Sequence, residues 1–340
     1  RRSATAAMNQ WTRRKHLLRP LRRRVAWPLE ALALAAFWQI CALMPADRAS
    51  ALGRALLRRV GPRLHWHRSL HANLAVAFPE HGPAQIAALT REAWGNFGAT
   101  FAEYPHLIDI GQRRFHEHVD LVLCPEVEAR RRARLPSVFV TAHLGNWELA
   151  GAAAASTGIP LSGVYARQTN PLINWMVQRY RRALGCGFLT NEAGARPLLA
   201  ELAAGRSLGL LADLRVDGGE PIPFFGQMVE TTLVPARLAL KFGCPLVPMR
   251  VERLGGVRFR ATAHPPIRPE DESADPLEQA RSMMRQVNAV LEGWIREQPA
   301  GWQCLKRRWS KSRVRRAPGA AGPLVRGEGV SAGALGANRS

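Results

Sequence analysis

Short apolar runs alternate with longer amphipathic stretches throughout the chain beyond Pro136. The short runs predict strands, and the stretches between them carry apolar residues at three- and four-residue spacings, which predicts helices. The stretch 276–297 shows this spacing most clearly. Alternation of this kind implies βαβ units, in which successive strands lie parallel and helices cover the sheet. We therefore expect an α/β fold with a largely parallel sheet flanked by helices.

The expected elements follow one another at short intervals. Strands are predicted over residues 137–141, 161–165, 187–190, 207–212, 245–252 and 257–262, with a hairpin at Gly255-Gly256. Helices are predicted over residues 146–156, 171–184, 196–204, 233–242 and 276–297. Upstream, two helical regions are predicted on either side of the loop 79–83.

The formal charge of +22 is concentrated at the two ends of the chain. Residues 1–24 carry nine Arg or Lys and no acid, and residues 306–340 carry nine against Glu328 alone, which leaves a net charge of only +5 for residues 25–305. The folded middle is therefore nearly balanced, and no nucleic-acid motif is evident in it. This argues against a nucleic-acid partner and favours an anionic membrane surface, which attracts basic flanking segments.

An apolar stretch at residues 25–45 follows Arg22-Arg23-Arg24. Its length is about that of a bilayer span, but Glu30 and Gln39 interrupt it, so a spanning helix and an interfacial helix are both open. The arginine cluster predicts a cytoplasmic side. We divide the chain into a basic tail (1–24), this membrane-associated helix (25–45), a catalytic domain (46–310) and a disordered basic tail (311–340).

The five cysteines are widely spaced, and no Cys-x-x-Cys pair occurs. Small histidine clusters at 65–71 and 116–118 have no matching cysteines nearby. We therefore expect no disulfide framework, a reducing compartment and no metal site.

His143 and Glu148 lie five residues apart where the apolar strand 137–141 ends. On one continuous helix these positions would face different ways, so they converge only if the backbone bends between them. A turn through Gly145 and a helix starting at Asn146 would supply that bend. The expected chemistry is a histidine general base whose other ring nitrogen is held by Glu148. The alternative is a histidine that only hydrogen-bonds a loop.

Arg167 and Asp213, like His143, come directly after predicted strands. Ligands of open α/β sheets gather at the carboxyl ends of the strands. Three polar side chains from separate strands are thus expected along one edge of the sheet, which favours the catalytic interpretation of His143.

These residues resemble the lipid A biosynthesis acyltransferases of the lauroyl or myristoyl type, within the lysophospholipid acyltransferase superfamily, over residues 25 to 310. The similar blocks are His143-Leu-Gly-Asn-Trp-Glu148, residues 164–171 with Arg179, Asp213-Leu-Arg215 leading to residues 223–226 and Thr231, residues 299–309, and Asn73-Leu74 before Phe78-Pro79. The resemblance implies a glycerol-phosphate acyltransferase-like fold. Asp213 is followed by Leu rather than Gln, and which arginine serves the second block is open.

The resemblance also implies a reaction. His143, oriented by Glu148, would take a proton from a hydroxyl of a lipid A precursor, and the oxygen would attack the thioester of acyl carrier protein. No cofactor and no metal would take part, and the domain would act from the cytoplasmic face of the inner membrane. The expected substrate-binding residues are Asn146, Arg167, Arg179, Asp213, Arg215 and Thr231.

Three other activities remain open. Two of them are the same acyl transfer to a different acceptor, which is either another glycolipid, such as a mannosylated phosphoinositide, or a lysophospholipid. Water as acceptor would make the protein an esterase, but a serine hydrolase is disfavoured because the chain lacks a Gly-x-Ser-x-Gly elbow.

Overall fold

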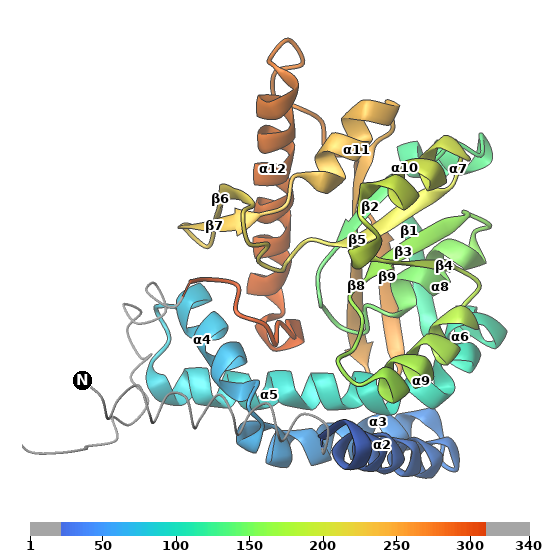
Figure 1. Cartoon of the computed structure of the whole chain (residues 1–340), viewed down its shortest axis with the longest axis vertical. Helices are drawn as coiled ribbons and strands as arrows, with labels where there is room; N and C mark the ends of the chain where they lie inside the picture. The colour runs from blue at the N-terminus through green and yellow to red at the C-terminus, as the bar shows by residue number, and fades with distance from the viewer. Residues whose placement is uncertain (1–21, 311–340) are drawn as a thin grey trace, which may run out of the picture.

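A computed structural model describes residues 22–310 of the 340-residue chain. Its centre is a seven-stranded sheet in the order β1-β9-β8-β2-β5-β3-β4 (Figure 1). Neighbouring strands are parallel except β8 and β9, which form an antiparallel hairpin. The predicted, largely parallel sheet is confirmed. The strands are β1 Val119–Leu123, β2 Val138–Thr141, β3 Leu161–Tyr165, β4 Gly187–Thr190, β5 Ser207–Leu211, β8 Leu246–Gly255 and β9 Arg258–Ala263.

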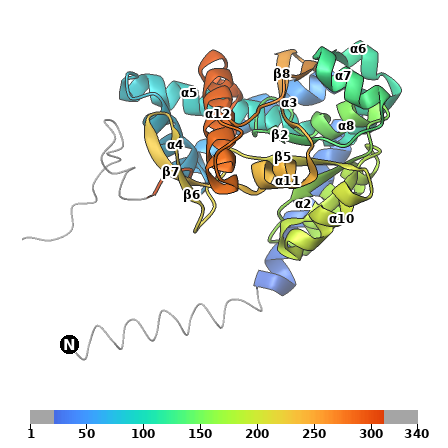
Figure 2. The same ribbon diagram turned by 90° about the horizontal axis from the view of Figure 1, so that it is seen from above.

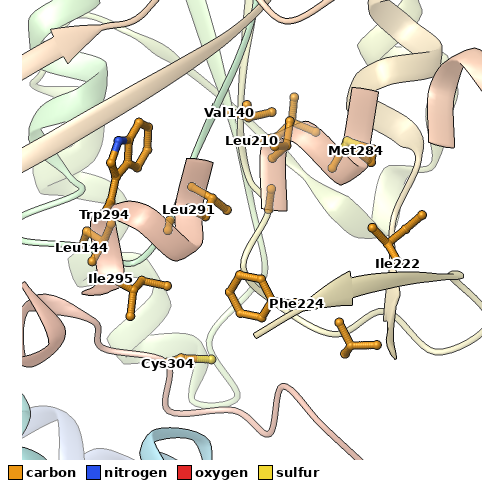
Figure 3. Packing of buried hydrophobic residues seen from close by; sticks show 14 of the residues in the cluster. Val140, Leu144, Leu210, Ile222, Phe224, Met284, Leu291, Trp294, Ile295 and Cys304 are labelled. Atoms are coloured by element: carbon orange, nitrogen blue, oxygen red, sulfur yellow. The ribbon is translucent and has the colours of Figure 1, made fainter. Parts of the chain in front are cut away.

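Helices cover both faces of this sheet, as the alternating pattern predicts. One face carries α10 (Ala195–Ala203), α11 (Val234–Phe242) and α12 (Pro276–Glu297), and the other carries α7 (Pro125–Arg132) and α8 (Leu149–Ser156). Val138 and Val140 of β2 belong to the first core, and Phe139 between them belongs to the second. Figure 3 shows the first core, where Leu291 of α12 lies in the same cluster as Val140. Burial on both faces explains why the central strands are continuous apolar runs.

Strand β1 and a separate two-stranded hairpin were not expected from the sequence. The hairpin consists of β6 (Glu220–Phe224) and β7 (Gln227–Thr231). Pro221 and Pro223 argue against a strand in sequence, but a two-stranded ribbon has outer edges where proline is tolerated. The expected helix 146–156 begins only at Leu149, which leaves a longer turn after β2.

Four N-terminal helices precede the sheet. They are α2 (Trp27–Ala42), α3 (Ala46–Val60), α4 (His67–Ala77) and α5 (Pro83–Ala102). Helices α3 and α5 pack backbone against backbone. Their close approach is shown by Gly53, where an added Cβ would lie 2.2 Å from the carbonyl oxygen of Gly98. In Figure 1, α5 runs across one end of the sheet. Its Thr100 donates a hydrogen bond to the carbonyl of Gly145 (3.0 Å), so this end is the carboxyl end of β2.

The apolar stretch 25–45 forms α2, and residues 23–42 are the one helix in the described part of the chain that is long and apolar enough to cross a membrane. The N-terminal end of α2 extends beyond the rest of the described chain (Figure 2). Its body packs against α9 (Pro171–Arg182) and α3. Shorter helical segments are α6 (Phe115–His118) and turns at Arg22–Ala26, Gly61–Arg63, Tyr104–His106, Asp109–Arg113, Asn191–Ala193 and Pro299–Gly301. Of the predicted basic tails, residues 1–21 and 311–340 lie outside the described residues.

Candidate active site

His143 lies in the turn that follows β2. Gly145 continues the turn at φ +55°, and a Cβ at that position would lie 2.5 Å from the carbonyl oxygen of Val251. A left-handed backbone and a close contact with β8 both require glycine here. Leu144 contacts the C-terminal segment through an isolated bridge to Trp302. The turn is therefore held on two sides by residues far away in sequence.

The carboxylate beside His143 belongs to Asp213. Strands β2 and β5 are parallel neighbours with Thr141 opposite Leu211, so His143 and Asp213 each come two residues after a paired position. The Nδ1 atom of His143 lies 2.8 Å from Oδ1 of Asp213. Oδ2 of the same carboxylate accepts the backbone N–H of His143 (3.1 Å) and the indole N–H of Trp302 (2.9 Å). Asp213 thus has three donors around a side chain with 0% exposure.

Asp213 is ionised in this setting. Burial raises its pKa, but the electrostatic interaction with His143 and the hydrogen bonds from His143 and Trp302 outweigh burial, so the pKa lies below the ordinary value. An ionised carboxylate only accepts hydrogen bonds, and therefore Nδ1 of His143 carries the proton. The lone pair of the neutral imidazole is then on Nε2.

The other ring nitrogen of His143 remains available. Within residues 22–310, no hydrogen bond to Nε2 is formed, and the side chain is 19% exposed. Trp147 packs edge-on against the ring at a centroid distance of 5.1 Å. An imidazole with a buried carboxylate behind Nδ1 and an accessible Nε2 has the geometry of a general base.

The prediction that Glu148 orients His143 is wrong. Arg181 of α9 binds both oxygens of Glu148 (2.8 and 2.6 Å), and Tyr104 donates its hydroxyl to Oε1 (2.8 Å). Burial raises the pKa of Glu148, but Arg181 and the hydrogen bonds bring it below the ordinary value. The same pairing raises the pKa of Arg181, although burial opposes it. Because α8 starts late, Glu148 turns toward α9, and its contacts are those of a buried ion pair that fixes the start of α8.

Asn146 is buried, and its side chain is hydrogen-bonded to two neighbouring residues. Its amide donates to Oε2 of Glu103 (2.8 Å), and its carbonyl accepts the backbone N–H of Glu148 (3.3 Å). Glu103 also binds Arg253 (2.5 and 3.0 Å) and Ser50 (2.6 Å). Since Asn146 has 0% exposure and both of its polar atoms bind neighbouring residues, the structure does not support its predicted role in binding substrate.

The three arginines predicted to bind substrate each have a different partner within the protein. Arg167 is 58% exposed and lies 3.6 Å from Glu192. Arg179 is exposed on α9 with its guanidinium 5.9 Å from the ring centroid of Trp175. Arg215 is paired with Glu230 (2.5 Å) and with Asp217 (2.8 Å). In the described residues, none of the three forms a hydrogen bond or ion pair with His143 or Asp213, so their predicted binding of substrate rests on the sequence alone.

Thr231 is fully buried and supports another arginine. Its hydroxyl accepts a hydrogen bond from Arg308 (3.0 Å), whose guanidinium also donates to the carbonyls of Leu214 and Glu230 (2.9 and 3.3 Å). Burial lowers the pKa of Arg308 to about 10. The expected role of Thr231 in substrate binding is therefore replaced by a structural one, which fixes the loop that carries Asp213.

Sequence reasoning missed three residues that support the site. Trp302 contacts Leu144 and Asp213, Arg308 binds the loop after Asp213, and Glu103 binds Asn146. The first two belong to the block 299–309, which stood out by resemblance but had no assigned role. The two tryptophans that flank a basic run in this block were the only sequence signal, and only the structure shows that Trp302, Arg308 and Trp309 are buried. Glu103 follows a long helix and has no comparable signal.

No cluster of three or more His, Cys, Asp or Glu that could hold a metal ion occurs in residues 22–310. All five cysteines are free thiols. Burial lowers the pKa values of His67 and His71, and Nδ1 of His67 accepts the indole N–H of Trp94 (3.2 Å). The interaction with Trp94 is a structural one.

Comparison with known proteins identifies the family of this chain and several similar proteins. A family model described as bacterial lipid A biosynthesis acyltransferase matches residues 14–311. A phosphatidylinositol mannoside acyltransferase of Mycolicibacterium smegmatis is 25% identical over 288 residues, covering 82% of this chain and 90% of that protein. One from Mycobacterium tuberculosis is 28% identical over 206 residues, covering 57% and 62%. The crystal structure of the 1-acyl-sn-glycerophosphate acyltransferase of Thermotoga maritima is 18% identical with a TM-score of 0.33, covering 70% of this chain and 98% of that one.

Proposed function

We propose that this chain, which belongs to the bacterial lipid A biosynthesis acyltransferase family, moves a fatty acyl chain from acyl carrier protein to a hydroxyl of a lipid A precursor. The observation that carries the proposal is the contact of His143 Nδ1 with the buried carboxylate of Asp213 at 2.8 Å. This contact leaves Nε2 as the proton acceptor.

The reaction follows from this pair in two steps. Nε2 of His143 takes the proton of the acceptor hydroxyl as its oxygen attacks the thioester carbonyl, and Asp213 stabilises the imidazolium that forms. The tetrahedral intermediate then expels the pantetheine thiolate, which takes the proton from the imidazolium. The ester bond forms, the thioester bond breaks, and His143 returns to its neutral state. No covalent acyl-enzyme and no cofactor take part in this scheme.

A second acceptor is favoured by the relatives. Both mycobacterial relatives are described as phosphatidylinositol mannoside acyltransferases, and the longer match spans 90% of its relative. Lipid A precursors and phosphatidylinositol mannosides are both anionic glycolipids with a free hydroxyl. A mannosylated phosphoinositide is therefore the second candidate acceptor.

An acceptor panel separates these activities. Purified protein is incubated with acyl carrier protein loaded with a labelled fatty acid, and with a lipid A precursor, a phosphatidylinositol mannoside, a lysophospholipid or no acceptor. We expect label in the lipid A precursor and its loss in a folded His143→Ala variant. Label only in the mannoside would establish the second acceptor, and release of free fatty acid without acceptor would establish an esterase.

The donor is tested at Lys306, which is exposed two residues beyond the buried Cys304. The thiol of Cys304 contacts the backbone of Asp213, so Lys306 lies close to the site in sequence and in the fold. An acidic carrier protein would be attracted to such a charge. We expect Lys306→Glu to raise KM for acyl carrier protein more than for an uncharged acyl-pantetheine. An equal change for both donors would contradict a carrier-protein contact at this position.

We also propose that α2 lies along the cytoplasmic surface of the inner membrane. One side of α2 packs on the protein, with Trp38 and Cys41 buried. The opposite side exposes Leu29, Leu32 and Leu43, which are 59–80% exposed and recur at spacings that keep them on one helix face. An apolar helix with one face uncovered is accounted for if lipid covers that face.

Both ends of α2 are tied to the catalytic body. At the first turn, the amide of Asn170 donates to the carbonyl of Trp27 (2.9 Å) and to Glu30 (3.1 Å). Near the last turn, the indole of Trp38 donates to the carbonyl of Phe101 (2.8 Å). A helix fastened in this way lies beside its domain, which favours the interfacial arrangement over a bilayer span. The Arg22-Arg23-Arg24 cluster at its start suits an anionic leaflet.

Vesicle flotation tests this arrangement. We expect Leu32→Glu to weaken binding to anionic vesicles. The control is Leu135→Glu, the same substitution at a 50% exposed site before β2, and it should leave binding unchanged. Alkaline carbonate should extract the wild-type protein from membranes. Resistance to carbonate would indicate a span, and equal flotation of both variants would contradict a role for this face of α2.

A further inference from the structure

The C-terminal segment 301–304, which we call the strap, lies against the turn that carries His143. The backbone N–H of Gly145 donates to the carbonyl of Gly301 (3.3 Å), and the backbone N–H of Gln303 donates to the carbonyl of His143 (2.9 Å). The side-chain amide of Gln303 donates to the carbonyl of Gly145 (2.7 Å). Backbone and side chain of the strap therefore hold the same turn.

Trp302 at the centre of the strap reaches Asp213. Its indole N–H donates to Oδ2 at 2.9 Å, and the residue has 0% exposure. The ring is packed among Phe224, Phe225 and Trp309, at centroid distances of 6.1, 6.3 and 6.2 Å. The indole N–H therefore donates to Oδ2 from within a buried aromatic cluster.

Both donors on Oδ2 determine how the carboxylate faces the imidazole. The backbone N–H of His143 and the indole of Trp302 converge on Oδ2, which leaves Oδ1 for Nδ1 of His143. With the indole removed, only the two hydrogen bonds from His143 hold the carboxylate, which then has more freedom to rotate about its bond to Cβ. The bond to Nδ1 then loosens, although no group that touches the substrate has been changed.

We propose that Trp302 is a positioning residue for the general base: its indole N–H orients Asp213 so that His143 presents Nε2 to the acceptor hydroxyl. This inference rests on the proposed acyl transfer. It assigns to the C-terminal block a role in catalysis rather than only in packing.

Trp309 provides a matched control. It is fully buried in the same aromatic cluster, and within residues 22–310 its indole nitrogen has no hydrogen-bond partner. Trp302→Phe and Trp309→Phe therefore remove the same ring atoms from one cluster. Only the first removes a donor from Asp213.

The experiment measures kcat, KM, thermal unfolding and the pH profile of kcat/KM for both variants and the wild type. We expect Trp302→Phe to lower kcat by about tenfold or more with KM little changed, since a hydrogen bond to a charged group is lost. Trp309→Phe should keep kcat within about twofold at a similar loss of thermal stability.

The pH profile separates positioning from packing. The charged and titratable groups near Asp213 are His143, Cys304 and Arg308. A looser hydrogen bond between Asp213 and Nδ1 stabilises the protonated imidazole less. The acidic limb of the Trp302→Phe profile should therefore move to lower pH, and that of Trp309→Phe should not move.

A second variant covers the case in which Trp302→Phe does not fold. Replacing Trp302 by β-(3-benzothienyl)alanine exchanges the ring N–H for sulfur and keeps the shape, and it should reproduce the loss of kcat. Equal kcat and equal acidic limbs in all variants, beside an active wild type and an inactive His143→Ala, would overturn the positioning role alone. Absence of acyl transfer in the wild type would overturn the proposed function and this inference together.

Discussion

Replacing Asp213 by Asn removes one negative charge from behind His143 and changes the side-chain volume little. The carboxylate is fully buried and 2.8 Å from Nδ1, so its interaction with the imidazolium is only weakly screened by solvent. At an effective dielectric constant of about 20, two unit charges at this separation interact by about 6 kcal/mol, an upper bound for the stabilisation that is lost. The hydrogen bond of a charged group gives a lower bound of about 1.5–3 kcal/mol.

These bounds predict a fall in kcat of about tenfold to 10⁴-fold, since each factor of ten corresponds to about 1.4 kcal/mol. The asparagine also replaces one carboxylate oxygen by an NH2 donor, and this donor, when it faces Nδ1, favours the imidazole tautomer with the proton on Nε2. The assay is transfer of a labelled acyl chain at saturating donor and acceptor, with the folded fraction checked by circular dichroism.

Glu148→Gln is the matched comparison, because the sequence alone favours Glu148 as the partner of His143. The two variants each neutralise one buried carboxylate within the same site region. We expect Asp213→Asn to act on kcat and Glu148→Gln to act on stability. A folded Asp213→Asn protein with wild-type kcat, or a larger loss of kcat from Glu148→Gln at equal folding, would refute the assignment of Asp213.

Three further outcomes follow from the same contacts. Glu148→Gln leaves the buried guanidinium of Arg181 without its partner, so denaturant unfolding should show a loss of about 3–5 kcal/mol, and an unchanged midpoint would contradict this. Gly145→Ala places a Cβ in a left-handed backbone conformation, 2.5 Å from the carbonyl oxygen of Val251. The turn must shift and displace His143, so the rate of acyl transfer should fall by about tenfold or more, whereas full activity would show that the turn is not constrained. Asp213 and Glu148 have pKa values below their ordinary 3.8 and 4.5, so the stability they add is complete above those values and lost as pH falls through the folded-state pKa. The melting temperature should therefore fall steeply below about pH 4.5. A melting temperature that stays constant down to about pH 3 would exclude this contribution.

The order of strands and helices could be predicted because local periodicity records it. The expected strand 161–165 and the expected helix 276–297 agree with β3 and α12 at both ends. Strand β1 was missed because it is short and half of it faces solvent, which weakens the apolar run. The hairpin of β6 and β7 was missed because its prolines obscure the pattern.

The edge of the sheet that carries the site was predicted correctly, but the pairing of side chains at that edge was not. His143 and Asp213 are 70 residues apart and meet only because β2 and β5 are neighbours in the sheet. Local sequence patterns do not determine the order of strands in a sheet. Glu148 was favoured because it is close in sequence. Its actual partner, Arg181, lies on α9, a helix whose packing against the start of α8 no local pattern reveals.

The most direct test of the account is the rate of acyl transfer by a folded His143→Ala variant in a single turnover with excess enzyme. Removing the imidazole removes the proton acceptor, so the account predicts a fall of about 10²-fold or more, with acyl carrier protein still bound. The intact mass of the wild-type protein during turnover should show no added acyl chain. A His143→Ala protein that transfers the acyl chain at the wild-type rate would contradict the central claim that His143 is the general base.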